Sequence, residues 1–129
     1  MHLDTCFLVD LQKERSTRAH GAAHAFLAKH PEEPMAISVV TAMEYLEGFE
    51  DGQLWTTDPF LNLFACVPLN LQAATRASRI RRNLRRSGSL IPDADILIAA
   101  SALVAGEPLV TDNTAHFARV DGLDVRGYR

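Results

Sequence analysis

Four acidic residues stand at or just past the end of a short apolar stretch of this chain: Asp4, Glu44, Asp95 and Asp112. In an open α/β sheet, ligands bind in the crevice outside the carboxyl ends of the strands. The arrangement therefore predicts one negatively charged pocket. Two carboxylates about 4 Å apart repel by roughly 4 kcal/mol at an effective dielectric constant of about 20. A cluster of this kind must bind a cation or retain protons at neutral pH, and hard oxygen ligands suit Mg²⁺ or Mn²⁺.

Each of these acids also has an ordinary structural explanation. Glu44 could bond back to a helix start at Thr41 in a capping box. Asp95 would lie in the first turn of a helix, where the macrodipole favours a negative charge, and Asp112 could begin a turn. Asp4 is the hardest to explain in this way, because it follows a buried strand, has no obvious partner in sequence, and an unpaired buried charge is costly.

Short strands alternate with helices along the chain, which predicts an α/β fold with a mostly parallel central sheet and helices on both faces. We expect strands at 1–3, 35–39, 65–68, 109–111 and 124–126. We expect helices at 5–11, 17–29, 41–49, 59–64, 71–86 and 93–105, with 51–57 as a loop. No repeat, low-complexity tract or linker interrupts the pattern, so residues 1–129 are expected to form a single domain.

The composition is that of an ordinary soluble protein, with 47% hydrophobic and 22% charged residues. Cys6 and Cys66 lie in apolar surroundings, and we expect both to be buried, reduced thiols. The longest apolar stretch, 96–104, is far shorter than the ~20 residues that span a bilayer. No secretory signal is visible. These features predict a cytoplasmic protein that does not insert into membranes.

The acidic residues belong to longer motifs that resemble those of the PIN-domain ribonucleases and, more narrowly, the VapC toxins of bacterial toxin–antitoxin pairs. The resemblance covers essentially the whole chain, in the order found in that family. The motifs are Leu3-Asp4-Thr5, Thr41-x-x-Glu44-x-x-x-Gly48, Ile91-Pro92-x-x-Asp95-x-x-Ile98-Ala99-Ala100 and Leu109-Val110-Thr111-Asp112-Asn113-x-x-x-Phe117. Each motif is weak alone, but four in register are specific. The resemblance implies a PIN-like three-layer α/β/α sandwich.

The resemblance also implies a Mg²⁺-dependent endoribonuclease, with Mn²⁺ as a possible substitute. Asp4, Asp95 and Glu44 would form the metal site. The fourth position is either Asp112 or Asn113, and Thr111 can join through its hydroxyl. Metal-activated water would cleave transfer or ribosomal RNA. The implied partners are the RNA, a VapB-like antitoxin and a second copy of the chain in a homodimer.

Two further side chains near these motifs receive no role in the predicted site. Asp93 is left out of the metal set, because two residues before Asp95 on a helix turn it points elsewhere. His116 occupies a position where the family often has an acid, and we expect it at the surface.

A basic segment contrasts with the acidic body of the chain. Six of the 13 basic residues lie between Arg76 and Arg86, and none of the 16 acidic residues lies there. On a helix, an apolar stripe would face the core and the arginines would face away from it. We expect Arg79, Arg82, Arg85 and Arg86 to contact RNA phosphates, with salt-dependent affinity. The alternatives are a solvated face or one that pairs with acids of a second subunit.

Three other functions compete with the ribonuclease hypothesis. An aspartyl phosphatase needs a second Asp two residues after Asp4, where this chain has Cys6. A receiver domain needs a lysine near the end of a late strand, where Asp112 and Asn113 stand. The third alternative is a non-catalytic PIN-fold module that binds RNA or protein.

Overall fold

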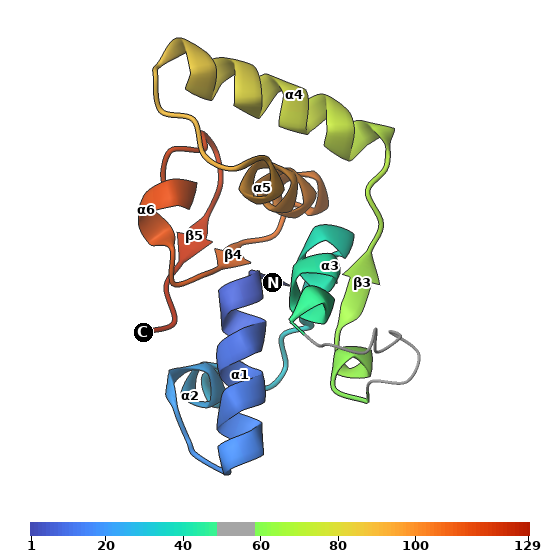
Figure 1. The fold of residues 1–129 in the computed structure, drawn as a ribbon, viewed down its shortest axis with the longest axis vertical. Coiled ribbons are helices and arrows are strands. Elements are labelled where there is room, and N and C mark those ends of the chain that lie inside the picture. Colours follow the sequence, from blue (N-terminus) through green and yellow to red (C-terminus); the bar gives the residue numbers. More distant parts are fainter. Residues whose placement is uncertain (49–58) are drawn as a thin grey trace.

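A sheet of five strands, with every neighbouring pair parallel, forms the centre of the molecule (Figure 1). This computed structural model describes residues 1–48 and 59–129. The strands are β1 (His2–Leu3), β2 (Ala36–Ser38), β3 (Ala65–Val67), β4 (Leu109–Val110) and β5 (Val125–Arg126). Their order across the sheet is β3-β2-β1-β4-β5. The predicted parallel sheet is therefore confirmed, and each expected strand is present in a shorter form.

Helices cover both faces of this sheet, which gives the three-layer α/β/α arrangement expected from the sequence (Figure 1). The helices α1 and α2 pack on one face, α4 and α5 on the other, and α3 contributes to both cores. Their bounds are α1 (Thr5–Thr17), α2 (Ala22–Lys29), α3 (Val39–Glu47), α4 (Leu71–Arg86), α5 (Asp93–Ala105) and α6 (Thr114–Phe117), with a 3₁₀ turn η2 (Leu61–Leu63).

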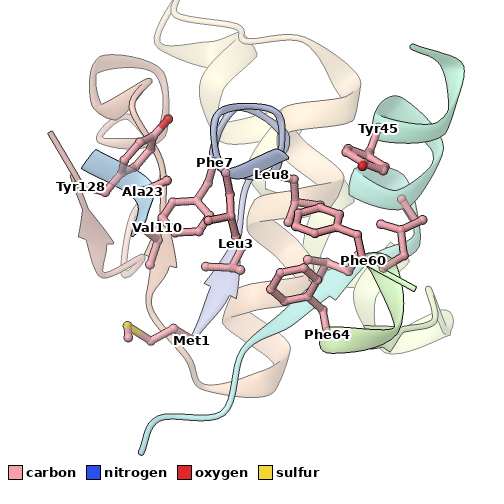
Figure 2. Packing of buried hydrophobic residues seen from close by; sticks show 14 residues of the cluster. Met1, Leu3, Phe7, Leu8, Ala23, Tyr45, Phe60, Phe64, Val110 and Tyr128 are labelled. Atoms are coloured by element: carbon pink, nitrogen blue, oxygen red, sulfur yellow. The ribbon is translucent and has the colours of Figure 1, made fainter. Parts of the chain in front are cut away.

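The core under α1 is rich in aromatic side chains (Figure 2). Phe7 is fully buried, and its ring meets the rings of Phe26 and Tyr128 edge-on, with centroids 5.8 and 4.8 Å apart. Such pairs are favourable because the positive edge of one ring meets the negative face of the other. Large apolar residues crowd together between positions 49 and 64, and from the sequence we expect most of them in the core. Of these, Phe60, Leu61 and Phe64 are buried. Phe49, Leu54 and Trp55 lie outside the described residues.

On the opposite face of the sheet, the helices predicted at 71–86 and 93–105 are confirmed. The apolar stripe of α4, formed by Ala73, Ala77, Ile80 and Leu84, is buried, and the helix has the predicted bounds. Helix α5 is buried on nearly all sides, also within its predicted bounds. It ends where Gly106 adopts a left-handed conformation with φ of 67°, which a glycine reaches without steric cost.

The first two helices were predicted with the wrong bounds. Helix α1 continues to Thr17, six residues beyond the expected end, and α2 begins only at Ala22. Arg18 ends α1 in a left-handed conformation with φ of 55°, a role that the sequence usually marks with glycine. The carboxylate of Glu14 then accepts hydrogen bonds from the backbone N–H groups of Ala23 and His24 at 3.1 and 2.8 Å. A side chain of the preceding helix thus caps α2, which no local pattern could indicate.

The capping box proposed for α3 is also wrong. The helix begins at Val39, and Ser38 is its N-cap, accepting a hydrogen bond from the backbone of Thr41 at 3.1 Å. This leaves the Glu44 carboxylate free for contacts outside its own helix. The expectation that Cys66 is buried is wrong as well, because it is exposed on β3 at the edge of the sheet.

None of the helices in the described ranges is both long enough and apolar enough to cross a bilayer.

The Phe7 cluster gives a direct test of the packing. We expect Phe7→Ala to lower the free energy of unfolding by about 3–5 kcal/mol, because it removes a fully buried ring and leaves a cavity. Urea denaturation followed by circular dichroism measures this value. Leu71→Ala, at a side chain that is 81% exposed, is the control and should change stability by less than about 0.5 kcal/mol. Equal effects of the two substitutions would contradict the packing described here.

Candidate active site

The two central strands bring the first and last acidic motifs together. The backbone N–H of Asp4 donates to the carbonyl of Val110 at 3.0 Å, so β1 and β4 end side by side. The chain leaves β1 toward β2 on one side, whereas β4 lies on the other side of β1. Such a switch point, at the carboxyl ends of the strands, is where open α/β sheets bind ligands.

The carboxylate of Asp4 is held by partners on both oxygens. It is the N-cap of α1, and its Oδ1 accepts from the backbone N–H of Thr5 at 2.8 Å. Its Oδ2 accepts from the hydroxyl of Thr111 at 2.7 Å, and Thr111 is fully buried. Asp4 itself is only 6% exposed. Its two partners come from the next residue and from Thr111, just past β4 and 107 positions along the chain. Neither was obvious in the sequence.

Thr5 connects Asp4 to the second acidic motif. Its hydroxyl donates to Oε1 of Glu44 at 2.6 Å, while its backbone N–H binds Asp4. One residue at the start of α1 thus joins two carboxylates that stand on different helices. Thr5 was not among the predicted site residues, although its place in the first motif marked it.

The third acid, Asp95, is brought to the same place from the first turn of α5. Its Oδ2 lies 3.3 Å from Nδ1 of His116, and the same ring nitrogen lies 2.7 Å from the side-chain amide of Asn113. The backbone N–H of Asn113 donates to the Thr111 hydroxyl at 2.9 Å, which closes a chain of contacts from Asp95 back to Asp4. The His116 side chain is 38% exposed, so it lies at the surface as expected, but its contact with Asp95 was not predicted. Its spacing of three from Asn113 on one helical turn was the available signal.

The charges of this cluster act on one another. Burial raises the pKa of the Asp95 carboxyl, and the negative charge of Asp4 raises it further. The hydrogen bond and the charge of His116 lower the pKa but do not cancel the rise. Asp4 and Asp95 are therefore close enough to repel, although they are 91 positions apart in the chain.

A thiol lies beside the same carboxylate. Sγ of Cys6 is 3.4 Å from Oδ2 of Asp4 and accepts a hydrogen bond from the backbone N–H of Asp112 at 3.4 Å. Burial and the Asp4 charge raise the pKa of this thiol. At neutral pH it is therefore protonated, and a protonated thiol is a poor nucleophile.

The remaining acids of these motifs have partners elsewhere. Asp112 is exposed, and its carboxylate pairs with Nε of Arg129 at 3.0 Å. Arg129 also contacts Asp10 on α1. Asp93 pairs with Nε of Arg81 on α4 at 3.0 Å, in keeping with its exclusion from the metal set. The structure thus brings Asn113, rather than the Asp112 carboxylate, into the contact network of Asp4 and Asp95.

The predicted RNA-binding arginines, Arg79, Arg82, Arg85 and Arg86, are all exposed on α4. Within residues 1–48 and 59–129, none of the four has a carboxylate within 4.0 Å. Their cationic groups are therefore available to a ligand, and their role stays a prediction.

The donor set suits a hard divalent cation. Among the described residues, no three His, Cys, Asp or Glu side chains lie together as a ready-made ligand cluster. Mg²⁺ does not need one, since it retains several waters and takes only one or two carboxylates directly. The charge of Asp4 that acts on Asp95, and the Thr111 and Asn113 side chains in the same contact network, fit an ion of that kind.

Comparison with known proteins identifies the class of this fold and site. The family model for the PIN domain matches residues 1–123, and the chain therefore belongs to the PIN-domain family. Within that family the chain groups with the VapC ribonucleases.

Two curated relatives and one solved structure support this grouping. Ribonuclease VapC1 of Methanocaldococcus jannaschii is 32% identical over 127 residues, which are 98% of this chain and 85% of that protein. The tRNA(fMet)-specific endonuclease VapC of Shigella flexneri is 36% identical over 94 residues, which are 69% of this chain and 71% of that protein. The DNA-bound VapBC structure from Salmonella typhimurium superposes with a TM-score of 0.84 at 25% identity, covering 99% of this chain and 97% of that chain.

The raised pKa of Asp95 predicts the sign of a stability change. Its folded-state pKa lies above its unfolded value, so the ionised carboxylate costs folding energy at pH 7, and this cost disappears as the pH falls below about 4. In a buffer with chelator, we expect Asp95→Asn to melt at a higher temperature than the unmodified chain at pH 7. The difference should vanish in acid. Calorimetry over a pH series measures it.

The matched control is Asp93→Asn on the same helix turn. It removes an exposed ion pair with Arg81, so it should leave the melting temperature unchanged or slightly lower. A lower melting temperature for Asp95→Asn at pH 7 would show that the ionised Asp95 carboxylate does not cost folding energy.

Proposed function

We propose that this chain is a Mg²⁺-dependent endoribonuclease and the toxin of a VapBC-type toxin–antitoxin pair. The observation that carries the proposal is the network at the ends of β1 and β4. In it, Asp4 and Asp95 come close enough for their charges to interact, and Glu44 is connected through Thr5. Placing the Asp4 and Asp95 carboxylates together lowers the stability of the fold. Local features that cost stability are expected at functional sites.

The roles of the side chains follow from their contacts. Asp4 and Asp95 would hold the ion, and Glu44 would orient its waters from outside. Thr111 donates to Asp4 and fixes the direction of that carboxylate. Asn113 would fill the fourth position, because the Asp112 carboxylate is engaged by Arg129. Asp112 would then support catalysis by holding the chain end against the site.

The chemistry needs no covalent intermediate on the protein. Mg²⁺, when bound, would lower the pKa of a water and neutralise negative charge on the phosphodiester, and Mn²⁺ would substitute. The chain offers no activated nucleophile at this place, since the Cys6 thiol has a raised pKa. His116, whose Nδ1 lies 3.3 Å from Asp95 Oδ2, would help to orient that carboxylate.

The substrate class and the partners rest on the relatives. We propose transfer or ribosomal RNA as the substrate; the name of the Shigella flexneri relative specifies tRNA(fMet). Solved VapBC structures contain chains of this fold. We therefore propose a VapB-like antitoxin as the cognate partner, a homodimer as the assembly and the cytoplasm as the compartment.

One observation favours a second candidate, a non-catalytic PIN-fold module that binds RNA or protein. No three acidic, His or Cys side chains of the described part of the chain are arranged as a complete ion-binding cluster. The two candidates differ in whether added Mg²⁺ produces new RNA ends.

We expect purified protein to cleave total RNA in Mg²⁺ and to lose this activity in chelator. Asp95→Asn should reduce the cleavage rate by about 100-fold or more, because it removes a charge on which ion binding depends. Asp93→Asn, two residues earlier on the same helix, should retain activity close to that of the unmodified chain. Primer extension on total RNA measures the rate and maps the ends. Equal rates for Asp95→Asn and the unmodified chain would refute the mechanism.

The toxin assignment predicts a separate result in cells. Expression of the chain should arrest growth, and Asp4→Asn should abolish the arrest. Coexpression of a small protein encoded beside this gene should restore growth and copurify with both forms of the chain. Growth curves and affinity purification measure these outcomes. If the Asp4→Asn protein is as toxic as the unmodified chain, the toxicity does not come from this site.

A further inference from the structure

A polar hollow of about 310 Å³ lies between α4 and the turn that follows α6, apart from the candidate active site. Arg76, Arg79 and Asn83 line it from α4, and Arg119 and Asp121 line it from the turn. Its floor is apolar and comes from buried core side chains of both segments. The hollow is therefore formed by fixed elements of the core, which hold three guanidinium groups around one space.

The charges of this hollow are not balanced within the described chain. Three arginines face one aspartate, Asp121. In the ranges 1–48 and 59–129, Arg76, Arg79 and Arg119 have no carboxylate within 4.0 Å. Guanidinium groups match the geometry of phosphate oxygens and bind them with paired hydrogen bonds, and the Asn83 amide adds a further donor. The hollow thus suits an anionic oxygen ligand.

The cationic surface continues along the helix pair. A neighbouring hollow of about 350 Å³ is also lined by Arg76 and Arg79 and extends to Leu103 and Val104 on α5. Because the two adjacent hollows share Arg76 and Arg79, they suit a ligand with several anionic groups in a row better than one small anion. A nucleic-acid backbone presents phosphates in such a series.

The hollow is connected to the active site through Arg119. This residue lies three positions after His116, which contacts Asp95. Its Nη1 donates to the carbonyls of Ser89 and Leu90 at 3.4 Å each, in the segment that leads into α5. The same short segments therefore position both a site carboxylate and a guanidinium of the hollow.

We propose that this hollow binds a backbone phosphate of the RNA at a position away from the one that is cleaved. The inference rests on the proposed function and adds a substrate-binding site to it. The arginines predicted from the sequence included Arg79 but not Arg76 or Arg119. Arg82 and Arg86, on the outer face of α4, line neither hollow.

Binding measurements test this inference without cleavage. The full chain carrying Asp95→Asn is titrated, in Mg²⁺, into a fluorescently labelled single-stranded RNA, and anisotropy gives Kd over a salt series. Adding Arg79→Gln and Arg119→Gln should weaken binding about tenfold at low salt. The slope of log affinity against log salt should fall by about 1.4, or about 0.7 for each lost phosphate contact.

The matched control is the pair Arg82→Gln and Arg86→Gln, which removes the same charge from the same helix. It should weaken binding clearly less than the hollow pair. Equal losses for the two pairs would mean a diffuse field rather than a site, and an unchanged Kd for the hollow pair would mean that its arginines serve another ligand, such as an acidic protein segment. Either result overturns the inference. Circular dichroism and the melting temperature confirm that both variants fold.

The failure of this inference is distinguishable from failure of the proposed function. If the unmodified chain cleaves RNA but the hollow pair binds it as tightly as its parent, only the phosphate site is wrong. If the unmodified chain does not cleave RNA, and neither it nor the Asp95→Asn chain binds RNA, the proposed function and this inference are both wrong.

Discussion

The hydrogen bond from the Thr111 hydroxyl to the Asp4 carboxylate joins the beginning of the chain to its last motif, and the site depends on it. Both groups are buried at the ends of neighbouring strands, where an unpaired carboxylate would be costly. The bond gives Asp4 a buried partner, and burial together with the nearby Asp4 raises the pKa of Asp95. The proposed cation site rests on these two neighbouring carboxyl groups.

The rigid parts of the fold are those that carry the acids. Asp95 stands on α5, the helix with the most complete burial among those described, and Asp4 caps α1, whose Phe7 lies in the aromatic core (Figure 2). Glu44 comes from α3, which packs into both cores. Side chains on such elements hold their positions more precisely than side chains on loops. The central sheet thus positions α1, α3 and α5, the three helices that carry or begin at these acids.

Charge is divided between two surfaces of the molecule. The acids of the candidate site are linked through Asp4 and Thr111 at the ends of β1 and β4. The arginines belong to α4, which lies above α5 (Figure 1). Arg81 pairs with Asp93 at the junction of these surfaces, so this arginine is occupied while its neighbours on α4 remain available. A cationic surface next to an acidic site attracts a polyanion that the site alone would repel.

The sequence by itself determined the fold class, the amphipathic helix α4 and the buried helix α5, because the apolar stripe of α4, the apolar composition of α5 and the glycines that follow them are local properties. It also showed that Asp4 and Asp112 follow strands, whereas Glu44 and Asp95 stand on the helices α3 and α5. It did not determine the end of α1. Arg18 ends that helix in a left-handed conformation, and Glu14 accepts a hydrogen bond from the start of α2, and neither is marked by a local pattern.

The partners within the site were decided only by the tertiary structure. Thr5 reaches Glu44, and His116 reaches Asp95, through contacts that depend on how the helices pack. The structure also separated Asp112, which pairs with Arg129, from Asn113, which bonds to Thr111. Adjacent residues of a turn point in different directions, and sequence spacing does not record which direction each side chain takes.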